Sequence, residues 1–303
     1  MEYLITYINV AIQYYCNLIN QHIIDFKFIN IGVVILASIS ALLIELMFVG
    51  FQASSLKKLL KQNNSLKNDL WCYVFDVSTI FLIVGKLLTF SIPYIVGFSI
   101  GEVLARLFPV ADFINSVPVL FRIGIILLVS ELANYWAHRT FHSSKILWEL
   151  HKYHHTSSEF GVLSAKRDHP MVVPIFSFFS AIPLAFLGSG SSAVGLAGLF
   201  VVTVHAMLIH SELKSDWGLF GRWILISPNL HRMHHAADQA NWGRNFGFIT
   251  PVWDRVFGTY YHSEKAMEVL GVQGSTINDM SFWQGMNQTT FEFLKKIFSK
   301  SAN

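Results

Sequence analysis

Histidine is the residue type that points to chemistry in this sequence. The chain has 13 histidines, and eight of them fall in two short windows, residues 138–155 and 231–235. An even scatter would place about one histidine there. Protonated imidazoles would repel one another, and buried neutral ones would each need a hydrogen-bond partner. A divalent transition metal resolves both difficulties because neutral imidazole is its natural ligand, so the clustering predicts a metal site.

Three motifs arrange these histidines by helical spacing. HRTFH begins at His138, HKYHH begins at His151, and HRMHH begins at His231. Residues three and four apart share one face of an α-helix, and Ser227-Pro228 before the last motif has the residue types of a helix start. A single HxxxH pair is more often structural, but three motifs together favour metal binding. One zinc ion takes three or four ligands, so eight imidazoles suit two ions.

Further polar residues lie near these motifs. Glu131 and Asn134 precede His138 by seven and four positions and continue its helix face. A carboxylate in an apolar helix costs several kcal/mol unless it is paired, so we expect this stripe to face one partner. His205 and His210 are five residues apart, which is about 140° on a straight helix. We therefore favour His210 as a ligand over His205.

The composition predicts a membrane protein. Of the 303 residues, 53% are hydrophobic and 14% are charged, whereas ordinary soluble domains carry about 25% charged residues. These values exclude a disordered chain and a disulfide scaffold. Two separate cysteines offer no thiolate metal site. A net charge of +3 is too small to indicate nucleic acid as a partner.

Apolar segments predict an all-α integral membrane bundle of four to five spans. Lys86 and Pro93 interrupt the second segment, which is therefore one kinked span or two halves. Residues 3–19 favour an interfacial helix, and Gly188-Ser189-Gly190 favours a hairpin between the last two spans. The candidate spans are residues 31–51, 73–100, 117–137, 171–187 and 192–209.

Loop charges predict the orientation of the bundle. Residues 52–71 carry four Lys and Arg residues, and residues 138–170 carry five. Such residues accumulate in cytoplasmic loops, which places both histidine windows in a helical cap on the cytoplasmic side. We divide the chain into a membrane-anchoring region (1–116), a catalytic region (117–262) and a cytoplasmic tail (263–303).

The motifs resemble a known family. HRTFH, HKYHH and HRMHH, together with Asn245-Phe-Gly247 and the stretch WDRVFGT at 253–259, are similar to the fatty acid hydroxylase/sterol desaturase superfamily of membrane di-iron oxygenases. The resemblance covers about residues 120–262 and is greatest to the alkylglycerol monooxygenase branch. The segment from His210 to Leu213 looks like the family's additional histidine. Ala206 lies four residues before His210, where a further ligand is expected, and His205 lies five before it, which leaves the tenth ligand open.

The resemblance implies a specific activity. A transmembrane core with a cytoplasmic cap would hold two iron ions through histidines alone, with no catalytic residue beyond these ligands. The family uses O2 to hydroxylate or desaturate a C–H bond of a lipid, and a separate reductase supplies the electrons. Asn245 and Asp254 would support the ligands. The implied ligands are His138, His142, His151, His154, His155, His210, His231, His234 and His235, with His205 as an additional candidate.

Two other functions fit the histidines. A zinc-dependent membrane hydrolase would act without O2 or a reductant. A metal transporter or sensor would need ionisable residues at the centre of several spans, and Glu45 and Lys86 are the central ones in this sequence. The lipid, the attacked carbon and the oligomeric state stay open at this stage.

Overall fold

The structure is a computed structural model that describes residues 27–61, 63–187, 192–238, 243–263 and 269–299. The predicted interfacial helix at 3–19 and the predicted turn at 188–190 lie outside these residues. Within them, regular structure is helical apart from one β-bridge between Ala236 and Leu270, which confirms the predicted all-α class. The longer helices are α2 (Lys27–Ala53), α4 (Asn64–Val77), α5 (Ile80–Leu88), α6 (Ile92–Leu107), α8 (Val119–Ser143), α10 (Val173–Leu187), α11 (Ser192–Ile209) and α15 (Phe282–Ser299).

Short helices connect the long ones and carry much of the site. They are α3 (Ser55–Leu59), α7 (Ala111–Ser116), α9 (Trp148–His155), α12 (Gly218–Trp223), α13 (Pro228–His234) and α14 (Val252–Val256), with 3-10 turns η1 (Val162–Lys166), η2 (Pro170–Val172) and η4 (Ile277–Asp279).

Three of the described helical segments are long and apolar enough to cross a membrane, namely Ile31–Ala53, Val119–Ser143 and Pro170–Leu187. Helices α4 and α5 pass the same test only as a pair, and the pair is bent by 74°. The described part of the chain therefore offers three spans, or four if the bent pair is one. Helix α11 forms where the fifth span was expected, and Gly198–Ile209, the part of it whose side chains are described, is an apolar helical segment.

The segment 73–100 is not one continuous helix, in agreement with the interruption that Lys86 and Pro93 predict. It is divided among α4, α5 and α6. Thr79 has a φ of 62°, and Phe90 and Ser91 have φ values of 50° and 54°. This left-handed conformation cannot continue a right-handed helix, so each of these positions ends or begins a helix.

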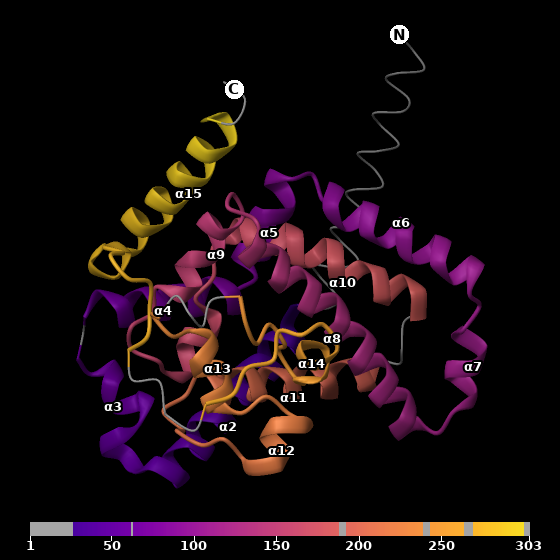
Figure 1. Ribbon diagram of the computed structural model, residues 1–303, viewed down its shortest axis with the longest axis horizontal. Helices are drawn as coiled ribbons and strands as arrows, with labels where there is room; N and C mark the ends of the chain where they lie inside the picture. Colours follow the sequence, from indigo (N-terminus) through magenta and orange to yellow (C-terminus); the bar gives the residue numbers. More distant parts are fainter. Residues whose placement is uncertain (1–26, 62, 188–191, 239–242, 264–268, 300–303) are drawn as a thin grey trace.

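The helices pack so that those bearing histidines meet. Helix α10 contacts both α6 and α8, α2 contacts α11, and α11 in turn contacts α13. Figure 1 shows α6 and α10 side by side, with α8 crossing the molecule beside α14. Helix α9 contacts α8. Near the C-terminal end of α8, the ring of His142 lies 5.0 Å from that of His151 in α9 and 4.7 Å from that of His234 in α13, so α8 meets both short helices that carry the HxxHH motifs.

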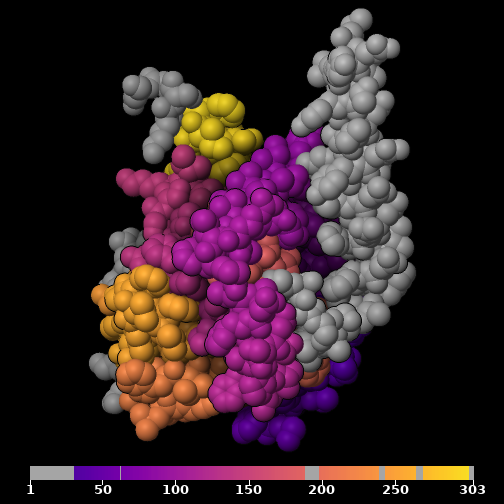
Figure 2. All heavy atoms as spheres, turned by 90° about the vertical axis from the view of Figure 1, so that its right-hand side faces the viewer, coloured from indigo at the N-terminus to yellow at the C-terminus, as the bar shows by residue number. Residues whose placement is uncertain are grey.

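The outer face of this assembly is apolar. Figure 2 shows the segments of α6, α7 and the start of α8 in the middle of one face. In α7 and the first turn of α8, Phe113, Leu120 and Phe121 are 63%, 78% and 70% exposed. Side chains of this size are unfavourable in water and favourable in lipid, so this face supports membrane association.

Two glycines let α6 approach α10 closely. A Cβ atom on Gly97 would lie 2.1 Å from the carbonyl oxygen of Phe178, and one on Gly101 would lie 2.4 Å from that of Ile182. Small residues four apart allow such backbone contact between membrane helices. The contact fixes the distance between α6 and α10.

We expect Gly97→Ala to reduce the stability of the protein by about 1–3 kcal/mol, because the added methyl group overpacks this contact. Thermal unfolding in detergent measures the change. The matched control is Gly124→Ala in α8, since nothing lies within 4 Å of a Cβ atom there. This substitution should be neutral or slightly stabilising, because alanine is the better helix former. Equal stability of the two variants would contradict the close packing.

Candidate metal centre

Nine histidines converge in two groups. Within each group, one ring nitrogen from every histidine lies within 4.8 Å of the others. The rings of His155 and His235, which belong to different groups, stack with their centroids 4.2 Å apart, so the groups are adjacent. All nine side chains are buried except His142, which is half-buried. The first group is His138, His142, His151, His155 and His234, and the second is His154, His210, His231 and His235.

Each group draws on several helices. Helix α8 supplies two histidines, α9 supplies three, α13 and its C-terminal cap supply three, and His210 directly follows α11. Helix α13 begins as the sequence predicts, because the Ser227 hydroxyl accepts a hydrogen bond from the Leu230 N–H (3.2 Å) and Pro228 takes the first helical position. The HxxHH motifs lie between the groups, so each contributes histidines to both.

Backbone carbonyls fix the tautomer of four of these imidazoles. A carbonyl oxygen only accepts hydrogen bonds, so the paired Nδ1 atom carries the hydrogen and Nε2 keeps its lone pair. This arrangement is typical of metal-binding histidines, whose second nitrogen donates to a carbonyl or carboxylate. The pairs are His138 with Phe246 (2.8 Å), His154 with Arg167 (3.1 Å), His210 with Ala206 (2.7 Å) and His234 with Arg244 (2.8 Å).

The remaining nitrogens fit a metal ion. The Nε2 atoms of His154 and His210 lie 3.3 Å apart, although both Nδ1 atoms already carry the hydrogen. Two lone pairs therefore face each other, which is unfavourable unless a cation lies between them. Other buried ring nitrogens have no hydrogen-bond partner within the described residues, among them both nitrogens of His151 and of His235. Burying a polar nitrogen without a partner destabilises the fold, and coordination of the nitrogen to a metal ion would remove this penalty.

The distances are also compatible with shared ions. Two imidazole nitrogens bound at about 2.1 Å to one ion lie at most about 4.2 Å apart. Within each group the ring nitrogens are at most 4.8 Å apart. The most widely separated nitrogens would therefore have to move together by less than about one ångström to share an ion. The residues present therefore fit two metal ions held by histidine alone.

Burial keeps these imidazoles neutral. It lowers the pKa of His154 and of His234 to about 4. Burial, reinforced by the neighbouring imidazoles, lowers the pKa of the other histidines outside α8 well below its usual value; these are His151, His155, His210, His231 and His235. Neutral imidazole is the form that binds a metal, so these histidines would need no deprotonation to bind one at neutral pH.

One loop orients two histidines of the first group. Arg244 and Phe246 supply the carbonyls that hold His234 and His138, and Asn245 between them has a φ of 56°. Asparagine tolerates this left-handed conformation better than most residues. The Asn245 side chain donates to the Tyr261 carbonyl and accepts from the Tyr261 N–H, both at 2.8 Å. These bonds anchor the loop.

Asp254 holds the same loop from the other side. Its carboxylate accepts the backbone N–H groups of Phe246 (2.7 Å) and Gly247 (2.8 Å) and the hydroxyl of Thr259 (2.7 Å). The carboxylate is fully buried. The geometry agrees with the supporting role that the family resemblance implies for Asn245 and Asp254.

Glu131 and Asn134 behave differently from each other. One oxygen of Glu131 accepts the backbone N–H groups of Phe248, Ile249 (2.6 Å) and Thr250 (3.3 Å). Glu131 therefore ties α8 to the loop that follows Phe246. Asn134 is half-buried and makes no side-chain hydrogen bond within the described part of the chain. The sequence predicts that Glu131 and Asn134 face one common partner. The loop is a partner of Glu131, but it forms no hydrogen bond with the Asn134 side chain in the described residues.

His205 lies outside both groups. Its Nε2 atom pairs with the carbonyl oxygen of Ile226 at 2.9 Å, and its ring lies 6.1 Å from that of Trp217. His169 is also elsewhere, since its ring nitrogens pair with the Thr290 hydroxyl and the Met171 N–H. The ligand set itself stays a prediction.

Two buried charged residues support the second group, and no motif in the sequence indicates them. The fully buried guanidinium of Arg167 pairs with Asp69 (2.9 Å) and Asn278 (2.8 Å), which fixes the carbonyl that holds His154.

Glu45 in α2 is the second of these residues, and the signal available in the sequence was a charged residue in an otherwise apolar region. Its carboxylate accepts the N–H and hydroxyl of Ser55 and the N–H of Glu212, two residues after His210. Glu45 is therefore paired locally, which removes one of two residues that favoured a transporter.

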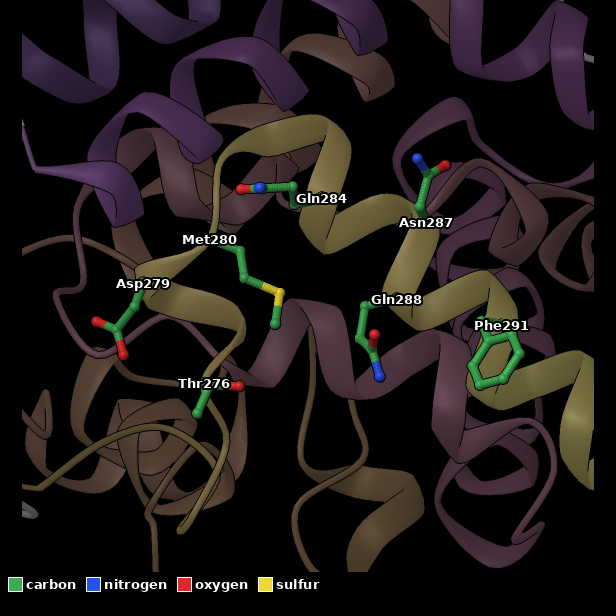
Figure 3. Close-up of a pocket in the computed structure, with 7 residues that line it drawn as sticks. All are labelled: Thr276, Asp279, Met280, Gln284, Asn287, Gln288 and Phe291. Atoms are coloured by element: carbon green, nitrogen blue, oxygen red, sulfur yellow. The ribbon is translucent and has the colours of Figure 1, made fainter.

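A hollow of about 650 Å³ between η4 and α15 is separate from these groups. Figure 3 shows Met280 and Gln288 facing its middle, with Gln284 and Asn287 along α15. None of its lining residues is a histidine. We therefore do not include it in the site.

Comparison with known proteins agrees with the motifs. Residues 123–259 match the family model of fatty acid hydroxylases. Alkylglycerol monooxygenase of Xenopus tropicalis is 32% identical over 130 residues, which cover 43% of this chain and 28% of the relative. Ornithine lipid hydroxylase OlsE of Rhizobium tropici is 27% identical over 158 residues, covering 52% of this chain and 47% of the relative. These alignments span less than half of either relative, and no solved structure gives a significant match. The resemblance drawn from the motifs is confirmed.

Proposed function

We propose that this chain, whose residues 123–259 match the fatty acid hydroxylase family, is a membrane-bound, non-haem di-iron oxygenase. It would hydroxylate or desaturate a C–H bond of a lipid, using O2 and electrons from a separate donor protein. The observation that carries the proposal is the pair of Nε2 atoms on His154 and His210, which face each other at 3.3 Å while both Nδ1 atoms are engaged. The similarity to an alkylglycerol monooxygenase and to an ornithine lipid hydroxylase supports a lipid substrate.

The chain's own residues prepare the site. The first histidine group would hold one ion and the second group the other. Backbone carbonyls keep the Nε2 lone pairs aimed inward. When bound, iron supplies the O2-dependent oxidation of the C–H bond, which protein side chains cannot perform.

Aromatic rings exclude water from the histidines. The ring of Phe141 stacks on that of His151 (5.2 Å), and the ring of Phe160 lies 4.8 Å from that of His235. Phe248 covers His138 at 4.9 Å. A dry site protects a reactive oxidant from side reactions. We place this site at the cytoplasmic face of the membrane, because the loops around it carry most of the Lys and Arg residues, with residues 117–262 as the catalytic region.

We expect the purified protein, loaded with ferrous iron and given membrane lipid, O2 and a reductant, to yield lipid products that gain one oxygen or lose two hydrogens. Mass spectrometry of the extracted lipids measures both changes. Omitting O2 or the reductant should abolish the products. Hydrolysed lipid formed by the zinc-loaded protein without O2 would contradict the proposal and favour a zinc-dependent hydrolase.

A further inference from the structure

A groove of about 290 Å³ runs between α5, α6 and α10. Its lining is mostly apolar, with Lys86 and Tyr94 on one side and Phe176 on the other. Leu184, which lines it from α10, is 46% exposed, so the groove opens to the surroundings of the helices. In a membrane, these surroundings are lipid.

Lys86 is the unusual residue in this groove. It is half-buried, and its ammonium lies 5.4 Å from the centre of the Tyr94 ring. No carboxylate within the described residues lies within ion-pair distance of it. Two acidic residues also line the groove, but both face other partners, because Asp76 pairs with Lys166 (2.8 Å) and Asp168 lies 3.9 Å from Nδ1 of His154. An unpaired charge in an apolar membrane region is costly and marks a functional site.

The groove ends close to the histidines. The ring of Phe176 lies 5.3 Å from that of Phe141 and 5.7 Å from that of Phe248. These two rings in turn contact the rings of His151 and His138. One layer of aromatic side chains therefore separates the groove from the first histidine group.

Close backbone packing holds the walls of the groove in place. A Cβ atom on Gly85, next to Lys86, would lie 2.8 Å from the carbonyl oxygen of Pro170. Gly97, one turn after Tyr94, meets the backbone of α10. Helices α5 and α6 are thus held against α10 and its preceding turn, so the groove exists before any ligand binds.

We propose that this groove binds an anionic lipid, with a phosphate or carboxylate oxygen of its head group in contact with the Lys86 ammonium. The lipid chain lies along Phe176, toward the histidines. The inference rests on the proposed oxygenase function only for its consequence, which is that the oxidised carbon lies near the head group because Lys86 and Phe176 line the same short groove.

The test measures lipid binding in the absence of reductant, so that it does not depend on turnover. The full-length, iron-loaded protein in a neutral detergent is titrated with phosphatidic acid, with oleic acid and with uncharged diacylglycerol. We expect Lys86→Gln to weaken the binding of an anionic lipid about tenfold, which corresponds to the loss of one charge-assisted contact. Diacylglycerol binding should not change, and Lys86→Arg should retain most of the anion binding.

The matched control is Lys57→Gln. The Lys57 ammonium also lies over an aromatic ring, that of Phe51 at 5.7 Å, but it is exposed on α3 outside the groove. The Lys57→Gln variant should bind all three lipids with the same affinity as the wild-type protein. A loss confined to phosphatidic acid identifies a phosphate-bearing lipid, and a loss confined to oleic acid identifies a carboxylate. Unchanged anion binding by Lys86→Gln, or an equal loss for all three lipids, would overturn the proposal.

A second pair of variants tests the groove without changing its charge. Ser180→Phe adds a large side chain at an exposed position in the lining and should weaken the binding of all three lipids. Ser99→Phe adds the same side chain at an exposed position of α6 that is not part of the lining, and should have no effect. If lipid binds through Lys86 but no lipid is oxidised, the proposed function fails while this binding site stands.

Discussion

The His154→Ala variant is expected to lose lipid oxidation almost completely, by at least about 100-fold, and to bind less iron. His154 provides one of the four imidazoles of the second group, and its Nε2 atom faces that of His210. Altering residues that merely orient metal ligands lowers metal affinity or activity by about 10–100-fold, so removing a ligand itself should lower the activity further. Elemental analysis by plasma mass spectrometry gives the iron content, and mass spectrometry of the lipids gives the activity.

His205→Ala is the matched control for this prediction. His205 is as buried as His154, at 8% exposure for each, but it is bonded to the carbonyl of Ile226 and lies outside both groups. Its loss should cost about 1 kcal/mol of stability, the contribution of a typical hydrogen bond, and leave the iron content unchanged. Full iron content and activity in His154→Ala would remove His154 from the ligand set. Loss of iron in His205→Ala would restore His205 as a candidate ligand.

The sequence predicts the convergence of the histidines because helical periodicity is local. The spacings in HRTFH and the two HxxHH motifs place their histidines on common helix faces, and Ser227-Pro228 marks the start of α13 correctly. The division into two groups is not predicted. His151 and His154 are one turn apart yet belong to different groups, and this depends on how α9 is rotated between α8 and α13. Such a rotation is a tertiary property that no motif in the sequence indicates.

Backbone contributions to the site are also invisible in the sequence. The carbonyls of Arg167, Arg244 and Phe246 orient histidines of the two groups, but every residue has a carbonyl, so no residue type indicates this role. The breaks at Thr79 and Phe90 likewise occur at residues without a strong preference for a positive φ. Tertiary packing overrides local preference at these positions. In contrast, Pro93 near the start of α6 is a local signal, and it correctly indicates that the segment 73–100 is interrupted.

We expect Asp254→Asn to lower the affinity for one of the two iron ions by about 10–100-fold while leaving every histidine in place. The carboxylate accepts two backbone N–H groups and one hydroxyl. An amide of the same size has one NH2 group that can only donate, so at least one of these donors loses its acceptor. The loop carbonyls of Arg244 and Phe246 should then shift, and with them the Nδ1 contacts of His234 and His138.

Both of these ligands belong to the first histidine group, whereas the second group is fixed by Arg167 and by the backbone at Ala206. The iron content of Asp254→Asn should therefore fall from about two ions per chain toward one, measured by elemental analysis at limiting iron. Asp216→Asn is the control, because Asp216 also accepts a backbone N–H, from Gly218, but is 37% exposed and holds no ligand loop. Thermal unfolding in detergent checks that both variants are folded. An equal loss of both ions in a folded Asp254→Asn variant would show that the two groups do not bind independently, and unchanged iron content would show that the loop does not hold the ligands.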